Sequence, residues 1–262
     1  MEAQLRRTAR KYLPGKIRRP LGLVGGKFKE WMLQPLQGLL FDLQGGRFRA
    51  NGCIFEIPKD LTTRRYRACF WNGDYEREER DLVARCIRPD DSVLEIGACL
   101  GIVSCVTNKL LPEKARHVVV EANPLCLAPL KRNKELNGAS FLIEHCAIST
   151  PPEATFYLHP IYIVGGSSQR PTDRPVRVPA KTIEQLEREH GPFTALILDV
   201  EGSEREIFER SGEVLTRYRL VLVELHEFAI GSEGVERCRE ILRKSGLRLV
   251  DRAGIAEAWQ RG

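Results

Sequence analysis

The sequence predicts an α/β protein in which helices cover both faces of a mostly parallel sheet. From residue 92 onward, short apolar runs typical of strands alternate with amphipathic runs typical of helices. The strand-like runs HVVV, ALIL and LVLV are apolar throughout, which is typical of strands buried on both faces. Ligands of such sheets usually bind beyond the carboxyl ends of the strands, so the candidate site lies there.

The expected elements of this core follow one another at short intervals. Glycine, proline or polar residues separate them, as is usual for short connections. The expected strands are 92–96, 117–121, 141–146, 195–199 and 220–225, and a closing hairpin is expected at 247–251 and 256–259. The expected helices are 101–111, 125–136, 182–189, 204–209 and 235–244. Seven strands in one sheet are therefore expected.

A smaller region precedes this core. Apolar and polar residues alternate at 39–41, 47–48 and 53–57 around two glycine-containing turns, which predicts an N-terminal β-hairpin region. Residues 72–86 have the spacing of an amphipathic helix, and Asp74 is placed to cap it. We therefore expect the hairpin to be joined to the core by a helix.

Composition excludes several classes of protein. Hydrophobic residues make up 42% and charged residues 29%, as in soluble globular proteins. No run approaches the roughly 20 apolar residues of a membrane span, and the basic start lacks the apolar run of a secretory signal. The eight cysteines form no CxxC pair, which argues against a zinc ribbon or a redox motif. A cytoplasmic location is expected, and oligomeric state is not readable.

Positive charge is concentrated at the N-terminus. Residues 1–30 hold nine Lys or Arg against two Glu, although the whole chain has a net charge of only +6. We expect a basic N-terminal arm at 1–35 and a catalytic domain at 36–262, divided into a hairpin extension (36–70) and a Rossmann-like core (71–262). The arm could contact a membrane or an acidic partner, or be a solvated tail. The remaining chain has no basic stripe with interleaved aromatic residues, so no nucleic acid is expected.

A glycine turn follows the first core strand. Gly97 and Gly101 in EIGACLG let a ligand approach the backbone, and the helix that starts there offers free N–H groups. Ala98 lies within this turn, and Glu95 at the end of the strand could hold a cationic amine. The spacing is not that of the dinucleotide motif G-x-G-x-x-G. These residues are the first part of a candidate cofactor site.

A second part follows at the end of the second strand. Glu121 is placed to accept hydrogen bonds from two ribose hydroxyls, with Ala122 and Asn123 directly after it. Cys146 and Ala147 follow the third strand and are expected near an adenine ring. A glycine turn plus an acid suits S-adenosylmethionine or NAD, and the pattern favours the methyl donor. The alternative is that Glu121 is a surface acid and Gly97 only a tight turn.

Acidic residues and a histidine follow the fourth and fifth strands. Asp199 and Glu201 leave the fourth strand, and strand alternation would place them on one face. We interpret Glu204 as an acid at a helix start. His226 ends the fifth strand, where its imidazole could remove a hydroxyl proton or be a structural residue. Asp199, Glu201 and His226 could also hold Mg²⁺, although this alternative is not favoured and no metal is assigned.

These segments resemble the FkbM family of S-adenosylmethionine-dependent methyltransferases. The resemblance rests on WNGDYEREE, EIGACLG, VEANP, VPAKTIEQL, LILDVEGSE and VELH, which occur in the family's order. The sequence departs from the family pattern at two positions, where Glu95 replaces an Asp and Cys99 replaces an Asn.

The resemblance implies a Rossmann-like class I methyltransferase fold with a mostly parallel seven-stranded sheet. It also implies transfer of a methyl group from S-adenosylmethionine to a hydroxyl of a sugar, a glycan or a natural product. We expect His226 to be the base, oriented by Asp199 or Glu201, and Asp199 also to border the cofactor. The irregular stretch 158–178 is expected to cover the acceptor as a lid or to be a plain insertion. An NAD-dependent oxidoreductase and a non-catalytic binding module remain the alternatives.

Overall fold

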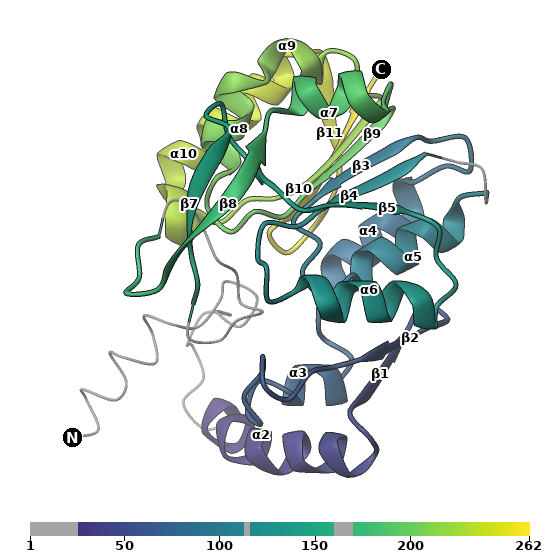
Figure 1. Ribbon diagram of the computed structural model, residues 1–262, viewed down its shortest axis with the longest axis vertical. Helices are drawn as coiled ribbons and strands as arrows, with labels where there is room; N and C mark the ends of the chain where they lie inside the picture. The colour runs from purple at the N-terminus through teal and green to yellow at the C-terminus, as the bar shows by residue number, and fades with distance from the viewer. Residues whose placement is uncertain (1–25, 113–115, 160–169) are drawn as a thin grey trace.

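The computed structural model describes residues 26–112, 116–159 and 170–262. Its centre is a seven-stranded sheet in the order β11-β12-β10-β9-β3-β4-β5 (Figure 1). In this sheet β12 pairs antiparallel with both β11 and β10, and all other neighbouring pairs are parallel. The strands are β3 (Val93–Ile96), β4 (His117–Val120), β5 (Leu142–Glu144), β9 (Ala195–Leu198), β10 (Leu220–Glu224), β11 (Leu247–Ala253) and β12 (Ala256–Arg261). The predicted Rossmann-like fold class is confirmed, including the closing hairpin.

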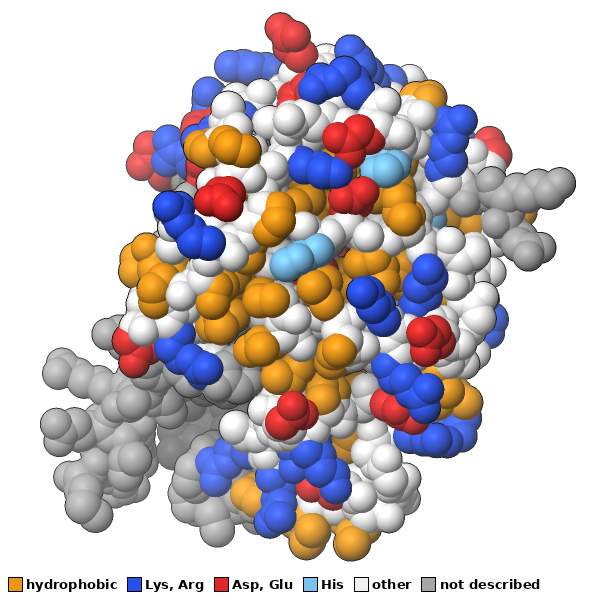
Figure 2. Space-filling model, in the orientation of Figure 1, with side chains coloured by type: hydrophobic (Ala, Val, Ile, Leu, Met, Phe, Trp, Pro, Cys, Tyr) orange, Lys and Arg blue, Asp and Glu red, His pale blue; other side chains and the backbone are white. Residues whose placement is uncertain are grey.

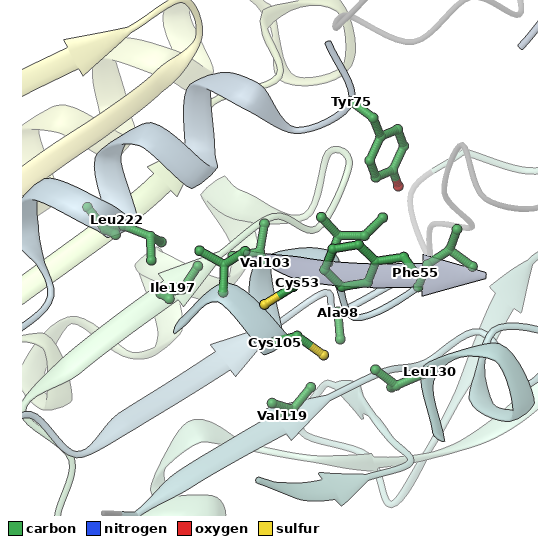
Figure 3. Close-up of a cluster of buried hydrophobic side chains, with 14 of the residues drawn as sticks. Cys53, Phe55, Tyr75, Ala98, Val103, Cys105, Val119, Leu130, Ile197 and Leu222 are labelled. Atoms are coloured by element: carbon green, nitrogen blue, oxygen red, sulfur yellow. The ribbon is translucent and has the colours of Figure 1, made fainter. Parts of the chain in front are cut away.

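Helices cover both faces of the sheet (Figure 1). One side carries α4 (Arg77–Cys86), α5 (Ile102–Leu110) and α6 (Leu127–Leu136), and the other carries α7 (Ile183–His190), α8 (Glu204–Arg210), α9 (Gly212–Leu215) and α10 (Glu227–Lys244). In Figure 3, Val119, Ile197 and Leu222 of the sheet share one buried cluster with Val103 and Cys105 of α5. Strand residues alternate between faces, so their chain neighbours join the cluster on the other side.

The N-terminal region forms a separate small layer below α6 in Figure 1. It consists of α2 (Gly26–Leu43), the hairpin β1 (Arg47–Ala50) and β2 (Cys53–Glu56), and α3 (Ala68–Trp71). Two asparagine side chains attach the hairpin to the core, Asn133 in α6 and Asn137 directly after this helix. Asn137 Oδ1 accepts from the Ile54 backbone N–H at 2.9 Å, and Asn133 Oδ1 accepts from the Glu56 backbone N–H at 2.8 Å. No helix among the described residues is long and apolar enough to cross a membrane.

Two sequence predictions in this region were wrong. Residues 39–41 lie in α2 rather than in a strand, because Phe41 turns inward and stacks on Phe70 at 5.9 Å. The helix expected at 72–86 begins only at Arg77, after a turn, and Asp74 does not cap it. The residue at the N-cap is Glu76, in the left-handed region at φ +50 and without a capping side chain.

A second, three-stranded sheet was not predicted. Its order is β6-β8-β7, formed by β6 (Ala147–Ile148), β7 (Glu153–Tyr157) and β8 (Pro175–Lys181). Residues 175–178, expected to be irregular, therefore belong to a strand. The middle of the expected lid, residues 160–169, lies outside the described residues.

Candidate active site

Four polar or glycine residues from the predicted site lie at one edge of the sheet. Gly97 follows β3, Glu121 follows β4, Asp199 follows β9 and His226 follows β10 by two residues. Because these strands are parallel, their carboxyl ends meet at the same edge. The sequence therefore predicted correctly which strand ends carry the candidate residues.

Gly97 brings two of these turns into contact. Its φ of +97 is a conformation that side chains rarely adopt, and a Cβ atom at this position would lie 1.8 Å from the carbonyl oxygen of Asp199. Only glycine therefore permits the turn after β3 to rest directly on the turn after β9. Gly101 (φ +77) has a different role, because a Cβ there would meet Leu130 at 2.5 Å, where α5 packs on α6.

The carboxylate of Glu121 is held by the backbone. Its Oε2 accepts a hydrogen bond from the Cys99 amide and its Oε1 from the Asn123 amide, both at 2.6 Å. Burial raises the pKa of Glu121 to about 7, although the amides of Asn123 and Cys99 oppose this shift. A carboxylate in this position still has lone pairs for hydroxyl donors.

His226 lies among four carboxylates. Its Nδ1 lies 2.5 Å from Glu204 Oε1. Its Nε2 lies 3.5 Å from Asp199 Oδ1 and 3.6 Å from both Glu201 Oε2 and Glu224 Oε2. Burial alone would lower the pKa of His226, but Glu201, Glu204 and Asp199 outweigh burial and raise the pKa to about 10. The ring is 1% exposed, so its immediate partners are these acids.

A tight turn, rather than strand alternation, brings Asp199 and Glu201 together. β9 ends at Leu198, so both residues lie beyond the strand. Glu201 adopts φ +53, in the left-handed region where a side chain other than Asn or Asp is uncommon. Such backbone strain is characteristic of functional sites, where the surrounding structure holds a side chain in place. Both side chains nevertheless lie near the same imidazole nitrogen, at 3.5 and 3.6 Å.

Glu95 has partners inside the protein. Its Oε1 accepts from the Ser104 hydroxyl at 2.5 Å, and its Oε2 lies 3.2 Å from His117 Nε2. These contacts lie between β3, β4 and α5, and Glu95 is 2% exposed. This geometry favours a structural role over the expected contact with a cationic amine.

The other expected cofactor residues lie near the same edge. Ala98 follows Gly97 in the first turn, and its amide donates to the Val120 carbonyl at 3.2 Å. Asn123 closes the second turn, because its Oδ1 accepts from the Leu125 amide at 3.0 Å. Ala122 packs with Ala147 in the small cluster beneath the three-stranded sheet, whereas Cys146 is buried in the main core.

Three residues near His226 were missed by the sequence analysis. Glu204, interpreted as an acid at a helix start, is fully buried and also accepts from the Gly202 amide at 2.9 Å. Glu224 is the last residue of β10 and is 2% exposed. Arg170 Nη2 lies 3.7 Å from Glu201 Oε2. An acid inside the apolar run LVLVEL was a usable signal for Glu224, whereas nothing in the sequence placed Arg170 beside Glu201.

Comparison with known protein families identifies the family of this chain. A family model described as the methyltransferase FkbM domain matches residues 95–249, which is more than half of the chain. A search of curated protein sequences found no match.

Among solved structures, the similarity is distant. Precorrin-6y C5,15-methyltransferase from Geobacter metallireducens is 12% identical, with a TM-score of 0.47 over 79% of this chain and 94% of that chain. The O-methyltransferase TomG from Streptomyces achromogenes is 17% identical, with a TM-score of 0.45 over 70% and 79% of the two chains. Because the family model covers both the glycine turn and the carboxylate cluster, the chain belongs to the FkbM family of S-adenosylmethionine-dependent methyltransferases.

Proposed function

We propose that the protein transfers a methyl group from S-adenosylmethionine to a hydroxyl group of a sugar, a glycan or a natural product. The observation that carries this proposal is the contact between Gly97 and the carbonyl of Asp199. It places the expected cofactor turn directly against the turn that bears the acids. Methyl transfer requires that the donor and a proton acceptor lie side by side, so this contact supports the proposal.

The residues at the strand ends fit the methyl donor. Glu121 presents a buried carboxylate where two ribose hydroxyls could donate to it, and the turn from Gly97 to Gly101 leaves backbone groups for the methionine part. Bound S-adenosylmethionine supplies an activated methyl group with a good leaving group. The protein's own task is then to align the acceptor oxygen and to remove its proton.

Glu201 is the best candidate for the base. A general base must reach the proton that it removes. The side chains of Asp199 and Glu201 are each 11% exposed, whereas that of His226 is fully buried. Among these acids, Glu201 also has the strained backbone. We therefore place Glu201 at the acceptor hydroxyl, with His226 as a positioning residue, rather than with His226 as the base that the sequence suggested.

We also propose that the chain is organised as a basic arm (1–35), a hairpin extension (36–70) and a catalytic core (71–262). The attachment of β2 to α6 by Asn133 and Asn137 supports counting the hairpin within the catalytic domain. Most of the arm lies outside the described residues.

Titration calorimetry with S-adenosylmethionine, S-adenosylhomocysteine and NAD is the direct test of the donor. We expect binding of the first two and none of NAD. Binding of NAD alone would support the oxidoreductase alternative and overturn the proposal. Incubation of the protein with labelled donor and pools of glycans and natural products then tests the acceptor. Label found only on nitrogen or carbon of the product would contradict transfer to oxygen.

A further inference from the structure

We propose that His226, Asp199 and Glu224 bind a divalent transition-metal ion, most closely matched by Mn²⁺. The ligand atoms of these three side chains all lie within 4.8 Å of one another. Ligands about 2.1 Å from a single ion are separated by about 3 Å when adjacent and about 4 Å when opposite. Small side-chain movements would therefore bring all three into coordination.

The imidazole is oriented as in known metal sites. Nδ1 faces the carboxylate of Glu204, so that Nε2 is directed at Asp199 and Glu224. Metal-bound histidines usually donate their second N–H to a carboxylate in this way, which fixes the ring and its tautomer. Nε2 itself is buried and has no hydrogen-bond partner among the described residues. A buried nitrogen of this kind is costly unless a proton acceptor or a metal completes it.

The charges around the ring also favour a cation. Asp199, Glu201, Glu204 and Glu224 all lie within 3.6 Å of a nitrogen of His226. The imidazole of His226 and the guanidinium of Arg170, whose Nη2 lies 3.7 Å from Glu201 Oε2, carry at most two positive charges beside these four carboxylates. Burial of charged groups is unfavourable unless opposite charges offset them. A dication would offset much of this excess.

The ligand set selects among the divalent ions. One imidazole nitrogen with two carboxylates is softer than the all-oxygen sites that Mg²⁺ and Ca²⁺ prefer. Carboxylates suit Mn²⁺, and imidazole suits the later first-row metals. Three protein ligands leave open positions for other oxygens. If the proposed function holds, the acceptor hydroxyl could occupy such a position, where a metal lowers the pKa of a bound oxygen.

The second acidic cluster provides an internal contrast. Glu144, Glu189 and His190 also meet the distance condition. There, however, the Lys181 ammonium lies 2.9 Å from Glu144 and 2.6 Å from Glu189, and His190 lies 2.7 Å from Glu144. A cation of the protein already occupies that cluster, so it is the matched control.

The test is titration of the chelator-stripped full-length protein with Mn²⁺ alone, followed by electron paramagnetic resonance. We expect uptake of a single Mn²⁺ ion, with nitrogen modulation in the electron spin echo from His226. Glu224→Gln should weaken binding by about 10- to 100-fold, and Glu144→Gln should leave it unchanged. Neither donor nor acceptor is present, so failure here would not count against methyl transfer.

Several results would overturn this site. They are the absence of Mn²⁺ uptake, uptake that Glu144→Gln weakens as much as Glu224→Gln, and bound Mn²⁺ without nitrogen modulation. The last result needs only the unmodified protein, so the proposal remains testable if a variant does not fold.

A different observation carries a second inference. Four leucines on α2 are exposed at a spacing of three and four residues: Leu33 (48%), Leu36 (52%), Leu40 (37%) and Leu43 (75%). This spacing places them along one side of the helix. At the end of the molecule formed by α2, Figure 2 shows hydrophobic side chains exposed beside Lys and Arg. In the sequence, the nine basic residues of 1–30 lie directly before and within this helix.

We also propose that this leucine face docks on an anionic membrane surface. Exposed leucines can enter the acyl region of a membrane, while basic residues next to them in the sequence can contact anionic lipid headgroups. A second copy of the chain would also bury leucines, but it would bring two basic segments together. Charge complementarity therefore favours the membrane, and this inference does not depend on methyl transfer.

Sedimentation with vesicles tests this inference. We expect the protein to bind vesicles that contain phosphatidylglycerol and not those of phosphatidylcholine alone. The double variant Leu36→Gln and Leu43→Gln should weaken binding by about 10-fold or more. Leu142 and Leu249 are each 46% exposed elsewhere, so Leu142→Gln with Leu249→Gln is the matched control. The proposal would be overturned if both double variants lost vesicle binding equally, or if the unmodified protein bound no vesicles. It would also be overturned if the protein were a dimer that only the Leu36→Gln, Leu43→Gln variant dissociates.

Discussion

Two buried histidines of this protein each face a buried glutamate, but their surroundings differ. His117 Nε2 meets Glu95, and Glu95 accepts a further hydrogen bond from Ser104. His226 Nδ1 meets Glu204, but its Nε2 faces three more carboxylates. Both rings are nearly inaccessible to water.

This comparison shows that burial and an acidic partner do not by themselves mark a functional histidine. At His117 both ring nitrogens have a hydrogen-bond partner. Nε2 lies 3.2 Å from Glu95 Oε2, and Nδ1 lies 3.4 Å from the side-chain nitrogen of Asn108. At His226 four carboxylates surround one imidazole, with Arg170 Nη2 3.7 Å from Glu201, and Nε2 has no hydrogen-bond partner among the described residues. Such imbalance is costly to folding, and it is retained where function requires it.

The largest difference is expected in catalysis. His226→Gln should lower kcat by about 100-fold or more, because it removes the group that positions the acids at the acceptor. His117→Gln changes a structural pair and should keep most of the kcat at a temperature where it remains folded. The measurement is turnover on an acceptor found in the labelled-donor assay. Equal losses in the two variants would remove the distinction between the pairs.

The next difference is expected in stability. Glu95→Gln should reduce the free energy of unfolding by about 3 kcal/mol, because it breaks a buried pair whose partners are otherwise satisfied. Urea unfolding followed by circular dichroism measures this effect. Glu144→Gln, at a half-buried cluster on the surface, is the control and should cost about 1 kcal/mol or less. If Glu95→Gln loses no more stability than Glu144→Gln, the interpretation of Glu95 and His117 as a structural pair is contradicted.

A change of stability in the opposite direction is expected among the acids around His226. In chelator-treated protein, Glu224→Gln should raise the free energy of unfolding by about 2 kcal/mol, because it removes one of four mutually repelling carboxylates. In the presence of Mn²⁺ the unmodified protein should be more stable than the variant, because it gains the free energy of metal binding. Thermal unfolding with and without Mn²⁺ checks both signs. A loss of stability in the chelator-treated variant would show that Glu224 is satisfied without a cation.

The sequence was sufficient for the sheet and for the strand ends that carry the site. Continuously apolar runs such as HVVV and ALIL have few alternatives to buried strands, and polar residues directly after them lie at one edge. The short segment 39–41 was ambiguous, because apolar residues at that length satisfy both helix and strand periods. In the structure these residues belong to α2, and Phe41 stacks on Phe70.

Side-chain partners within the site could not be predicted from the sequence. Glu95, the third residue of β3, and Glu224, the last residue of β10, stand in similar apolar runs, yet Glu95 meets Ser104 and Glu224 meets His226. The direction of an acid that lies beyond a strand depends on the turn in which it stands. The left-handed conformation of Glu201 changes that direction in a way that residue spacing does not reveal.

The smallest expected effect concerns a third buried acid, Glu121, whose partners are backbone amides rather than a histidine. Burial raises its pKa to about 7 from the ordinary value of 4.5. Between these values the folded chain holds a proton that the unfolded chain has released, so stability should fall as pH rises from about 4.5 to 7. Under the proposed function, donor binding should change in the opposite direction, because ribose hydroxyls would donate to the ionised carboxylate.

If only the ionised form binds, affinity for S-adenosylhomocysteine should fall about 10-fold between pH 8 and pH 6. Calorimetry across this range measures the change, and Glu121→Gln should bind weakly at both values. An affinity that does not vary with pH in the unmodified protein would remove Glu121 from the donor site. Glu121 would then resemble Glu95, a buried acid whose described partners lie within the protein.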